Sequence, residues 1–267
     1  MEFIKPNWPA PKNINAVTTT RASLNLSHYV DDDLEQVMAN RELLFKQLNL
    51  PCEPVWLDQQ HSVEVVDLGE MLSSRGLTAG SRKQLNLKLD PAVKPRDDSM
   101  RDLKADGSYT NKANVVCAVL TADCLPILLC SNDGTEVAAI HAGWRGLLNG
   151  VIASGVRYFK CRPGKLLAWL GPAISQQAFE VGEEVREAFI QRDSRTAAAF
   201  YPSKNSNRFM ADLYQLAKFQ LNQLGVDKIY GGDFCTYSDR KRFYSYRRDG
   251  QTGRMGSLIW RSSIKLL

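Results

Sequence analysis

Short apolar runs with almost no polar positions fill the middle of the chain. They are VVCAVL at residues 115–120, LPILLC at 125–130 and VAAI at 137–140, and an Asn-Asp-Gly turn at 132–134 separates the last two. Runs of this length and composition predict strands that are buried on both faces. A sheet of such strands needs one layer above it and another below. Leu166–Leu170 predicts a further strand that ends at Gly171 and Pro172.

Helical periodicity surrounds these strands. Residues 31–50 place apolar side chains on one stripe, and residues 146–158 and 183–191 also read as helices. Asp212 and Gly225 bracket a fourth helix as N-cap and terminator. Helices and strands alternate without a strict βαβ rhythm, which favours an α+β fold. We expect a single domain over residues 1–267, a layered α-β-β-α sandwich with mixed sheets. The stripe at 31–50 consists of Leu34, Val37, Met38, Leu44, Phe45 and Leu48.

The region before the apolar runs is less regular. Residues 55–68 alternate around His61 and predict a short strand. Residues 73–104 are rich in Lys, Arg, Asp, Pro and Ser, which is typical of a flexible loop.

Composition limits the classes of function. The chain has 267 residues and a net charge of +5, which is too small to indicate nucleic acid as a partner. No run approaches the roughly 20 apolar residues that span a bilayer, and no secretory signal is evident. Six cysteines lack a framework spacing, so we expect a reduced, cytoplasmic protein that does not act on membranes. Basic residues near the C-terminus could hold a phosphate or simply form a solvated surface; they are Arg240, Lys241, Arg242, Arg247, Arg248 and Arg254.

Cys124 and His141 each stand at the boundary of an apolar run. A hairpin would bring both side chains to one edge of a sheet, and zinc is bound by Cys and His in catalytic sites that keep one position open. Of the remaining histidines, His28 lies in a polar segment and reads as a surface residue, so we choose His61 as the third ligand. The alternatives are that His61 is an ordinary packed or surface residue and that Cys124 is a structural thiol.

Residues beside these ligands offer further chemistry. Asp123 could orient a ligand or cap a turn. Gly143 and Gly146 flank Trp144 and Arg145, so free N–H groups and the guanidinium could bind an anion there, and the indole could stack on a heterocycle or lie in the core.

Arg41 falls on the apolar stripe of the first helix. A guanidinium on a core-facing surface needs a polar or anionic partner unless its stem snorkels past the edge. We therefore treat Arg41 as a candidate functional residue.

Several motifs together resemble the YfiH-type family of purine nucleoside phosphorylases, formerly called laccase-domain or multicopper polyphenol oxidase proteins. The resemblance covers nearly the whole chain. It rests on SLNL (23–26), NR (40–41), ADGSYT (105–110), TADCLP (121–126), HAGWRG (141–146), GPAI (171–174), CT (235–236), FYSYRR (243–248) and TGRM (252–255).

This resemblance implies a catalytic zinc held by His61, Cys124 and His141, with Arg41 in the active site. It implies phosphorolysis of adenosine, inosine and methylthioadenosine, with adenosine deamination as a second activity. From the matching motifs we assign Asn25 to substrate binding, and among the basic residues Arg145, Arg247 and Arg248. The expected partners are purine nucleosides and phosphate, and the expected state is a monomer or homodimer.

The chain departs from the family pattern at two site motifs. The usual Gln-Val-His-Gly is Gln59-Gln60-His61-Ser62 here. Where the family often has a cysteine before its aromatic-Glu-Val, this chain has Gln177 and Ala178 before Phe179.

Three other functions use the same residues. A copper polyphenol oxidase needs many imidazoles around several copper ions, and three histidines cannot supply them. A Cys–His hydrolase would use Cys124 as nucleophile and His141 as base, and editing of cell-wall precursors would change the substrate class. A zinc-stabilised binding module would need a fourth ligand, and none is evident.

Overall fold

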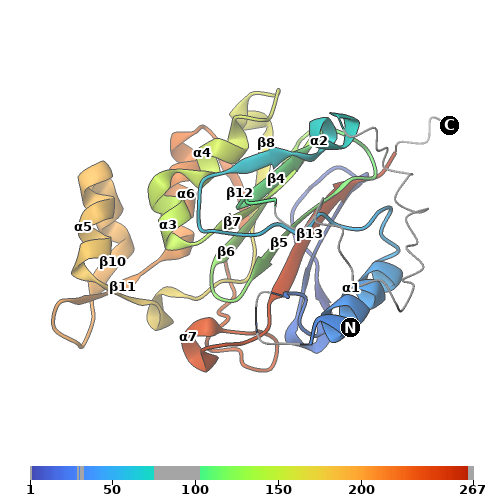
Figure 1. Ribbon diagram of the computed structural model, residues 1–267. Coiled ribbons are helices and arrows are strands. Elements are labelled where there is room, and N and C mark those ends of the chain that lie inside the picture. The colour runs from blue at the N-terminus through green and yellow to red at the C-terminus, as the bar shows by residue number, and fades with distance from the viewer. Residues whose placement is uncertain (1, 29, 31–32, 75–102, 264–267) are drawn as a thin grey trace.

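A six-stranded mixed sheet forms the centre of the molecule (Figure 1). The computed structural model describes residues 2–28, 30, 33–74 and 103–263, so most of the loop predicted at 73–104 lies outside the described residues. The central strands β6 and β7 form an antiparallel hairpin, and the outer pairs β12–β8 and β3–β4 are parallel. In spatial order the strands are β12 (Lys228–Gly231), β8 (Leu166–Leu170), β6 (Leu125–Ser131), β7 (Val137–Ala142), β4 (Gly107–Thr110) and β3 (Val65–Asp67).

A four-stranded antiparallel sheet packs against the first. Its order is β1 (Phe3–Ile4), β2 (Ile14–Thr19), β13 (Met255–Arg261) and β5 (Val116–Thr121). Alternate residues of one strand enter different cores. On β6, Ile127 faces the core beneath the helices, and Leu128 faces the core between the sheets. The fully apolar strands predicted from the sequence are therefore confirmed, because both of their faces are covered.

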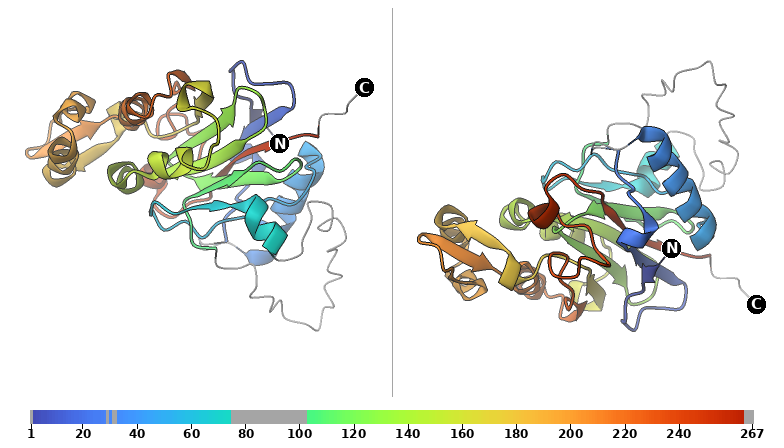
Figure 2. Two further views of the ribbon diagram at one scale, coloured as in Figure 1. Left: turned by 90° about the horizontal axis from the view of Figure 1, so that it is seen from above. Right: turned by 90° about the horizontal axis from the view of Figure 1, so that it is seen from below.

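Helices complete two outer layers (Figures 1 and 2). The six-stranded sheet is covered by α3 (Trp144–Asn149), α4 (Val151–Val156) and α6 (Leu213–Gln223), and the four-stranded sheet by α1 (Leu34–Leu48). The α-β-β-α sandwich is thus confirmed. The remaining helices are α2 (Leu68–Ser74), α5 (Glu183–Arg192) and α7 (Tyr246–Asp249).

A third sheet lies with α5 at one end of the molecule, on the left in Figure 1. Its antiparallel strands are β10 (Phe200–Pro202), β11 (Arg208–Ala211) and β9 (Glu180–Gly182). Sequence periodicity predicts the helix here but not the short strands.

Two helix predictions need correction. The helix expected over 146–158 is two short helices, because Gly150 adopts a left-handed φ of 93° that ends α3 and starts α4. On α1, Leu34 and Met38 are exposed, at 47% and 53%, so the buried stripe runs instead through Val37, Asn40 and Leu44. By contrast, Asp212 caps α6 as predicted, since its side chain accepts the N–H of Gln215.

The strand expected around His61 is also shorter than predicted. Only Val65–Asp67 pairs as β3, and His61 lies in a loop with φ 58°. Within the described ranges, no helix combines the length and apolar character that crossing a membrane requires.

Candidate functional site

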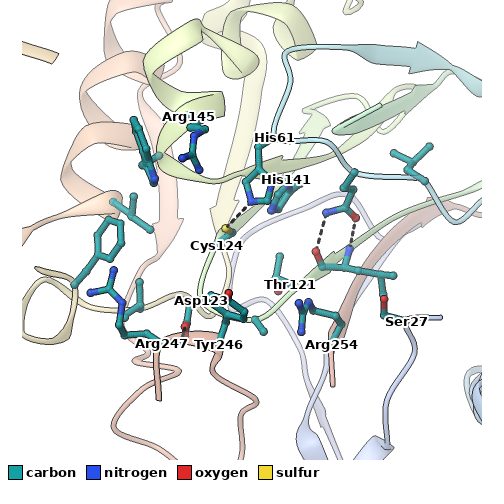
Figure 3. A pocket seen from close by; sticks show the side chains of 18 of the residues that line it. Ser27, His61, Thr121, Asp123, Cys124, His141, Arg145, Tyr246, Arg247 and Arg254 are labelled. Carbon is teal, nitrogen blue, oxygen red and sulfur yellow. Dashed lines mark hydrogen bonds between the residues drawn. The ribbon is translucent and has the colours of Figure 1, made fainter. Parts of the chain in front are cut away.

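His61, Cys124 and His141 converge as the sequence predicts. Cys124 immediately precedes β6, and His141 lies near the end of β7, where it pairs with Pro126. The hairpin thus brings these two side chains together at its open end. His61 reaches them from the loop before β3, and the three side chains point toward one another (Figure 3).

The donor set fits a zinc ion. One ligand atom from each residue lies within 4.8 Å of the others. Sγ of Cys124 is 3.7 Å from Nε2 of His61, and a tetrahedral zinc site with normal bond lengths separates such atoms by about 3.6 Å. Two imidazoles and one thiolate leave one position of a tetrahedral ion open. The three residues could therefore hold a metal without rearrangement of the backbone.

Asp106 organises two of the three ligands. It is fully buried at the start of β4. Its Oδ1 accepts Nδ1–H of His141 at 2.7 Å and the backbone N–H of His61 at 3.0 Å. Its Oδ2 accepts the N–H and the hydroxyl of Ser62 at 2.6 and 2.7 Å. Because a carboxylate only accepts, the proton of His141 sits on Nδ1 and Nε2 is directed to the metal position.

The charges of the site are coupled. Burial opposes the charge of Asp106, but its bonds with His141 and Ser62 outweigh this and lower its pKa to about 2. Burial likewise disfavours the Cys124 thiolate, yet His141 and His61 lower its pKa to about 6. For His141, burial is outweighed by Cys124 and Asp106, which raise its pKa to about 9. The site therefore stabilises the thiolate that a metal needs.

Gly143 leaves room for the ligands. A Cβ at this position would lie 2.9 Å from Cδ2 of His61 and 3.0 Å from Sγ of Cys124. These distances are too short for ordinary contacts, so any side chain here would displace a ligand. The sequence suggested that Gly143 lets the backbone approach a bound anion. In the structure, Gly143 instead makes room for the side chains of His61 and Cys124.

The triad opens into a cavity of about 530 Å³. One wall carries apolar and aromatic side chains, among them Phe179, Ile174 and Leu213. Trp144 is half-buried, and it both packs against the core and lines the cavity. The guanidinium carbon of Arg145 lies 4.5 Å from the centroid of the Trp144 ring. Arg145 is exposed at the start of α3, and the anion site expected at residues 143–146 stays a prediction.

Of the two predicted binding residues near the C-terminus, one lines the cavity and the other does not. Arg247 lines the cavity beside Phe179, 5.2 Å from its ring centroid. Arg248 does not line it: its guanidinium donates to the carbonyl groups of Thr236 and Phe243 and pairs with Asp249. Its buried position makes it a structural contact of the loop.

Arg41 and Asn25 also lie behind the cavity wall. Arg41 donates to the carbonyl of Leu26 from Nε and Nη2, at 2.9 and 2.7 Å, and contacts Nδ1 of His28. His28 is therefore half-buried and bonded, not the surface residue that its polar neighbours suggest. Asn25 is buried and accepts the backbone N–H of Arg254.

Asp123 fixes the C-terminal segment. This buried residue adopts φ 90° and its carboxylate accepts the hydroxyls of Thr236 and Ser245 and the N–H of Arg247. Of the two roles expected for it, the contacts support the turn anchor, because none of them is to a metal ligand.

Sequence reasoning missed two residues of the site, Asp106 and Ser27. Asp106 stands inside a recognised motif but received no role, and Arg254 was named only as one of the basic residues that could hold a phosphate. Ser27 and Arg254 line the cavity on the side away from Arg247 (Figure 3). The one sequence signal for Asp106 was its place in the motif ADGSYT (105–110).

The family model described as multi-copper polyphenol oxidoreductase laccase matches residues 13–262. Purine nucleoside phosphorylase YfiH of Escherichia coli is 45% identical over 97% of this chain and 98% of its own length. Purine nucleoside phosphorylase of Haemophilus influenzae is 42% identical over 97% and 99%.

Solved structures agree with this relationship. A Neisseria meningitidis protein superposes with a TM-score of 0.84 at 41% identity, covering 98% of this chain and 100% of the other. YlmD of Geobacillus stearothermophilus gives 0.78 at 27% identity, covering 98% and 97%. With its fold and almost its whole length matched, the chain belongs to the YfiH family, whose family model carries the laccase description.

Proposed function

We propose that this protein is a zinc-dependent purine nucleoside phosphorylase that acts on adenosine, inosine and methylthioadenosine, with adenosine deamination as a second activity. The observation that carries the proposal is the His61–Cys124–His141 group at the floor of a cavity with one aromatic wall and several arginines. The relatives named purine nucleoside phosphorylase support the reaction class. The cytoplasmic location and the monomeric or dimeric state stay predictions.

Zinc fits the donor set better than copper does. A multicopper oxidase needs imidazoles for several ions, whereas the chain has three histidines and His28 is bonded to Arg41. The copper oxidase named by the family model is therefore not the activity that this chain supports.

In phosphorolysis, different parts of the cavity would contact different parts of the substrates. A phosphate oxygen bonds to ribose C1′ while the bond from C1′ to purine N9 breaks, so the purine leaves with the electron pair and takes up a proton. The ring of Phe179, with Ile174 and Leu213, offers an apolar surface for the purine. A bound zinc ion would supply Lewis acidity toward a substrate oxygen, or activate a water for deamination.

Charged side chains of the protein would orient the substrates and the metal ligands. Arg145 and Arg247 line the cavity, which supports a role for both in substrate binding. Arg41, Asn25 and Arg248 serve the reaction from behind the wall, because each holds backbone that leads into the cavity. Asp106 keeps His141 in the tautomer that binds a metal.

The test is a nucleoside panel with and without phosphate. Zinc-loaded protein is expected to release adenine from adenosine and methylthioadenosine, and hypoxanthine from inosine, only when phosphate is added. His61→Ala and Cys124→Ala are expected to abolish release. Deamination is followed separately, as conversion of adenosine to inosine without phosphate. Purine release that continues unchanged without phosphate and without metal would exclude the proposal.

A second candidate is a Cys–His hydrolase, including one that edits cell-wall precursors. The bond of 2.7 Å between Asp106 and His141 matches the arrangement in which a carboxylate orients the base of a cysteine nucleophile. Hydrolysis by this route needs a metal-free thiolate, so it would persist in a chelator, whereas the zinc-dependent reaction would stop.

A further inference from the structure

We propose that Arg254, on the cavity wall it shares with Ser27, is the binding site for the phosphate co-substrate. This inference rests on the proposed phosphorolysis and deepens it, because it selects one arginine among the many near the site. From the sequence, Arg254 is only one of six basic residues near the C-terminus that could hold a phosphate.

Arg254 is a half-buried cation without an ion pair. Its Nη1 donates to the carbonyl groups of Thr252 and Gly253 within its own turn, and no carboxylate of the described residues pairs with it. Its Nε and Nη2 have no acceptor in the described part of the chain, and the residue lines the cavity. A partly desolvated guanidinium with a free edge is a strong site for an oxyanion, which can accept two parallel hydrogen bonds.

No carboxylate of the described residues forms an ion pair with Arg254. Asp123 also lines the cavity and its charge reaches Arg254, but its carboxylate accepts its hydrogen bonds from Thr236, Ser245 and Arg247. Thr121, which lines the cavity and precedes Asp123, has a buried hydroxyl with no partner among the described residues. That hydroxyl is too buried to contact a ligand, so it is the free Nε and Nη2 of Arg254 that indicate a polar group on this wall.

The other arginines are less suited to this role. Arg145 is exposed and stacks on Trp144, and Arg247 is exposed and donates to the carbonyl of Glu180. Water solvates and screens such exposed charges, so they bind an anion weakly. Arg254 is the cavity arginine whose desolvation makes an anionic partner most valuable.

Three family motifs hold this arginine in place. Asn40 and Arg41 of α1 donate to the carbonyl groups of Asn25 and Leu26. The side chain of Asn25 then accepts the backbone N–H of Arg254, directly before β13. Asn25, Asn40 and Arg41 are therefore positioning residues that act on phosphate through Arg254.

The phosphate and metal sites share one cavity. Burial lowers the pKa of Arg254, and the charges of Cys124 and Asp123 oppose that shift. The guanidinium therefore lies within electrostatic reach of the metal ligand. In Figure 3 Arg254 and Arg247 lie on opposite sides of the cavity, with the triad above them, so a nucleoside on the wall that carries Arg247 leaves Arg254 open to phosphate.

The experiment measures phosphate binding and turnover separately on zinc-loaded protein. Calorimetric titration with inorganic phosphate, without nucleoside, gives Kd, and initial rates with inosine give KM for each substrate. Arg254→Gln removes the charge. Arg240→Gln, an exposed residue of the same C-terminal segment, makes the same change in net charge and is the matched control.

Arg254→Gln is expected to raise the phosphate Kd and KM at least about tenfold, and the inosine KM less than about twofold, because a charged bidentate contact is lost. Arg254→Lys should recover part of the affinity, and Arg240→Gln should match wild type. Asn25→Ala should raise the phosphate KM without a matching rise for inosine, which a general loss of structure would not do.

Two failures can be told apart. Phosphate affinity unchanged in Arg254→Gln, with phosphorolysis intact, overturns the inference and leaves the proposed function standing. Phosphate binding that depends on Arg254 without any purine release supports the anion site and overturns the proposed function. Should Arg254→Gln not fold, as judged by zinc content and melting temperature, Arg254→Met decides, because it keeps an unbranched stem without the charge: a phosphate Kd equal to wild type refutes the site.

Discussion

Replacing Asp106 by asparagine tests whether the buried carboxylate prepares the metal ligands. Asp106 accepts five hydrogen bonds, from the N–H groups of Gln60, His61 and Ser62, the Ser62 hydroxyl and Nδ1 of His141. The amide of Asp106→Asn keeps the shape of the side chain but turns one acceptor oxygen into a donor. Two bonds are lost if the amide nitrogen takes the place of Oδ1, and three if it takes the place of Oδ2.

The expected loss is large. A hydrogen bond to a charged group contributes about 1.5–3 kcal/mol, so the metal-free variant should be less stable by about 3 kcal/mol or more. Loss of a carboxylate that orients a metal-bound imidazole typically weakens metal affinity about 10–100-fold. Both effects have one cause, because His141 and the loop carrying His61 depend on the same side chain.

The assay is zinc competition against a chromophoric chelator, together with denaturant unfolding of the metal-free protein. Asp133→Asn is the control. Asp133 also accepts hydrogen bonds from neighbouring residues, Ser131 and Thr135, but it lies in the turn at the opposite end of the β6–β7 hairpin. A zinc affinity of Asp106→Asn within about twofold of that of Asp133→Asn would refute the reasoning.

Three further predictions follow from the contacts described above. Gly143→Ala should lower zinc affinity at least about tenfold, because the new Cβ would press on His61 and Cys124. Gly164→Ala is the control, because the atom nearest to its Cβ is 3.6 Å away. Equal zinc affinities of the two variants would contradict the packing argument. Tyr214→Phe should destabilise the protein by about 1–3 kcal/mol in denaturant unfolding, because its buried hydroxyl accepts the N–H of Ala173 and donates to a carbonyl. Iodoacetamide should label Cys124 only after chelator treatment, while buried Cys117 stays unlabelled; mass spectrometry reads both, and labelling of Cys124 in zinc-loaded protein would speak against metal ligation.

The layers of the fold were predictable because the central strands contain almost only apolar residues. The runs at 115–120 and 125–130 have no polar face, so only a strand covered on both sides accommodates them. The break at Gly150 was not predictable, since a glycine inside a helical pattern is usually tolerated. The prediction that Leu34 and Met38 of α1 are buried was wrong. Periodicity shows which face of a helix is apolar, but it does not show how much of that face the neighbouring layer covers.

The site was predictable where local pattern and hairpin geometry agree, as for Cys124 and His141. It was not predictable where the partner is remote. The bond from Arg254 to Asn25 spans 229 residues of chain, and the bond from His141 to Asp106 spans 35. Arg41 illustrates the difference: its place on a buried helix face was correctly inferred, but the structure directs its guanidinium to the carbonyl of Leu26 instead of into the cavity.

The position of β13 has a consequence for how the protein matures. This strand comes near the end of the chain yet sits between β2 and β5, in the interior of its sheet. A nascent chain that has emerged as far as Ala142 already carries all three side chains for the ion, but it has neither the strand that completes the sheet nor Arg254 beside it. Metal binding can therefore precede the assembly of the cavity wall, and catalysis must wait until β13 and Arg254 have been synthesised.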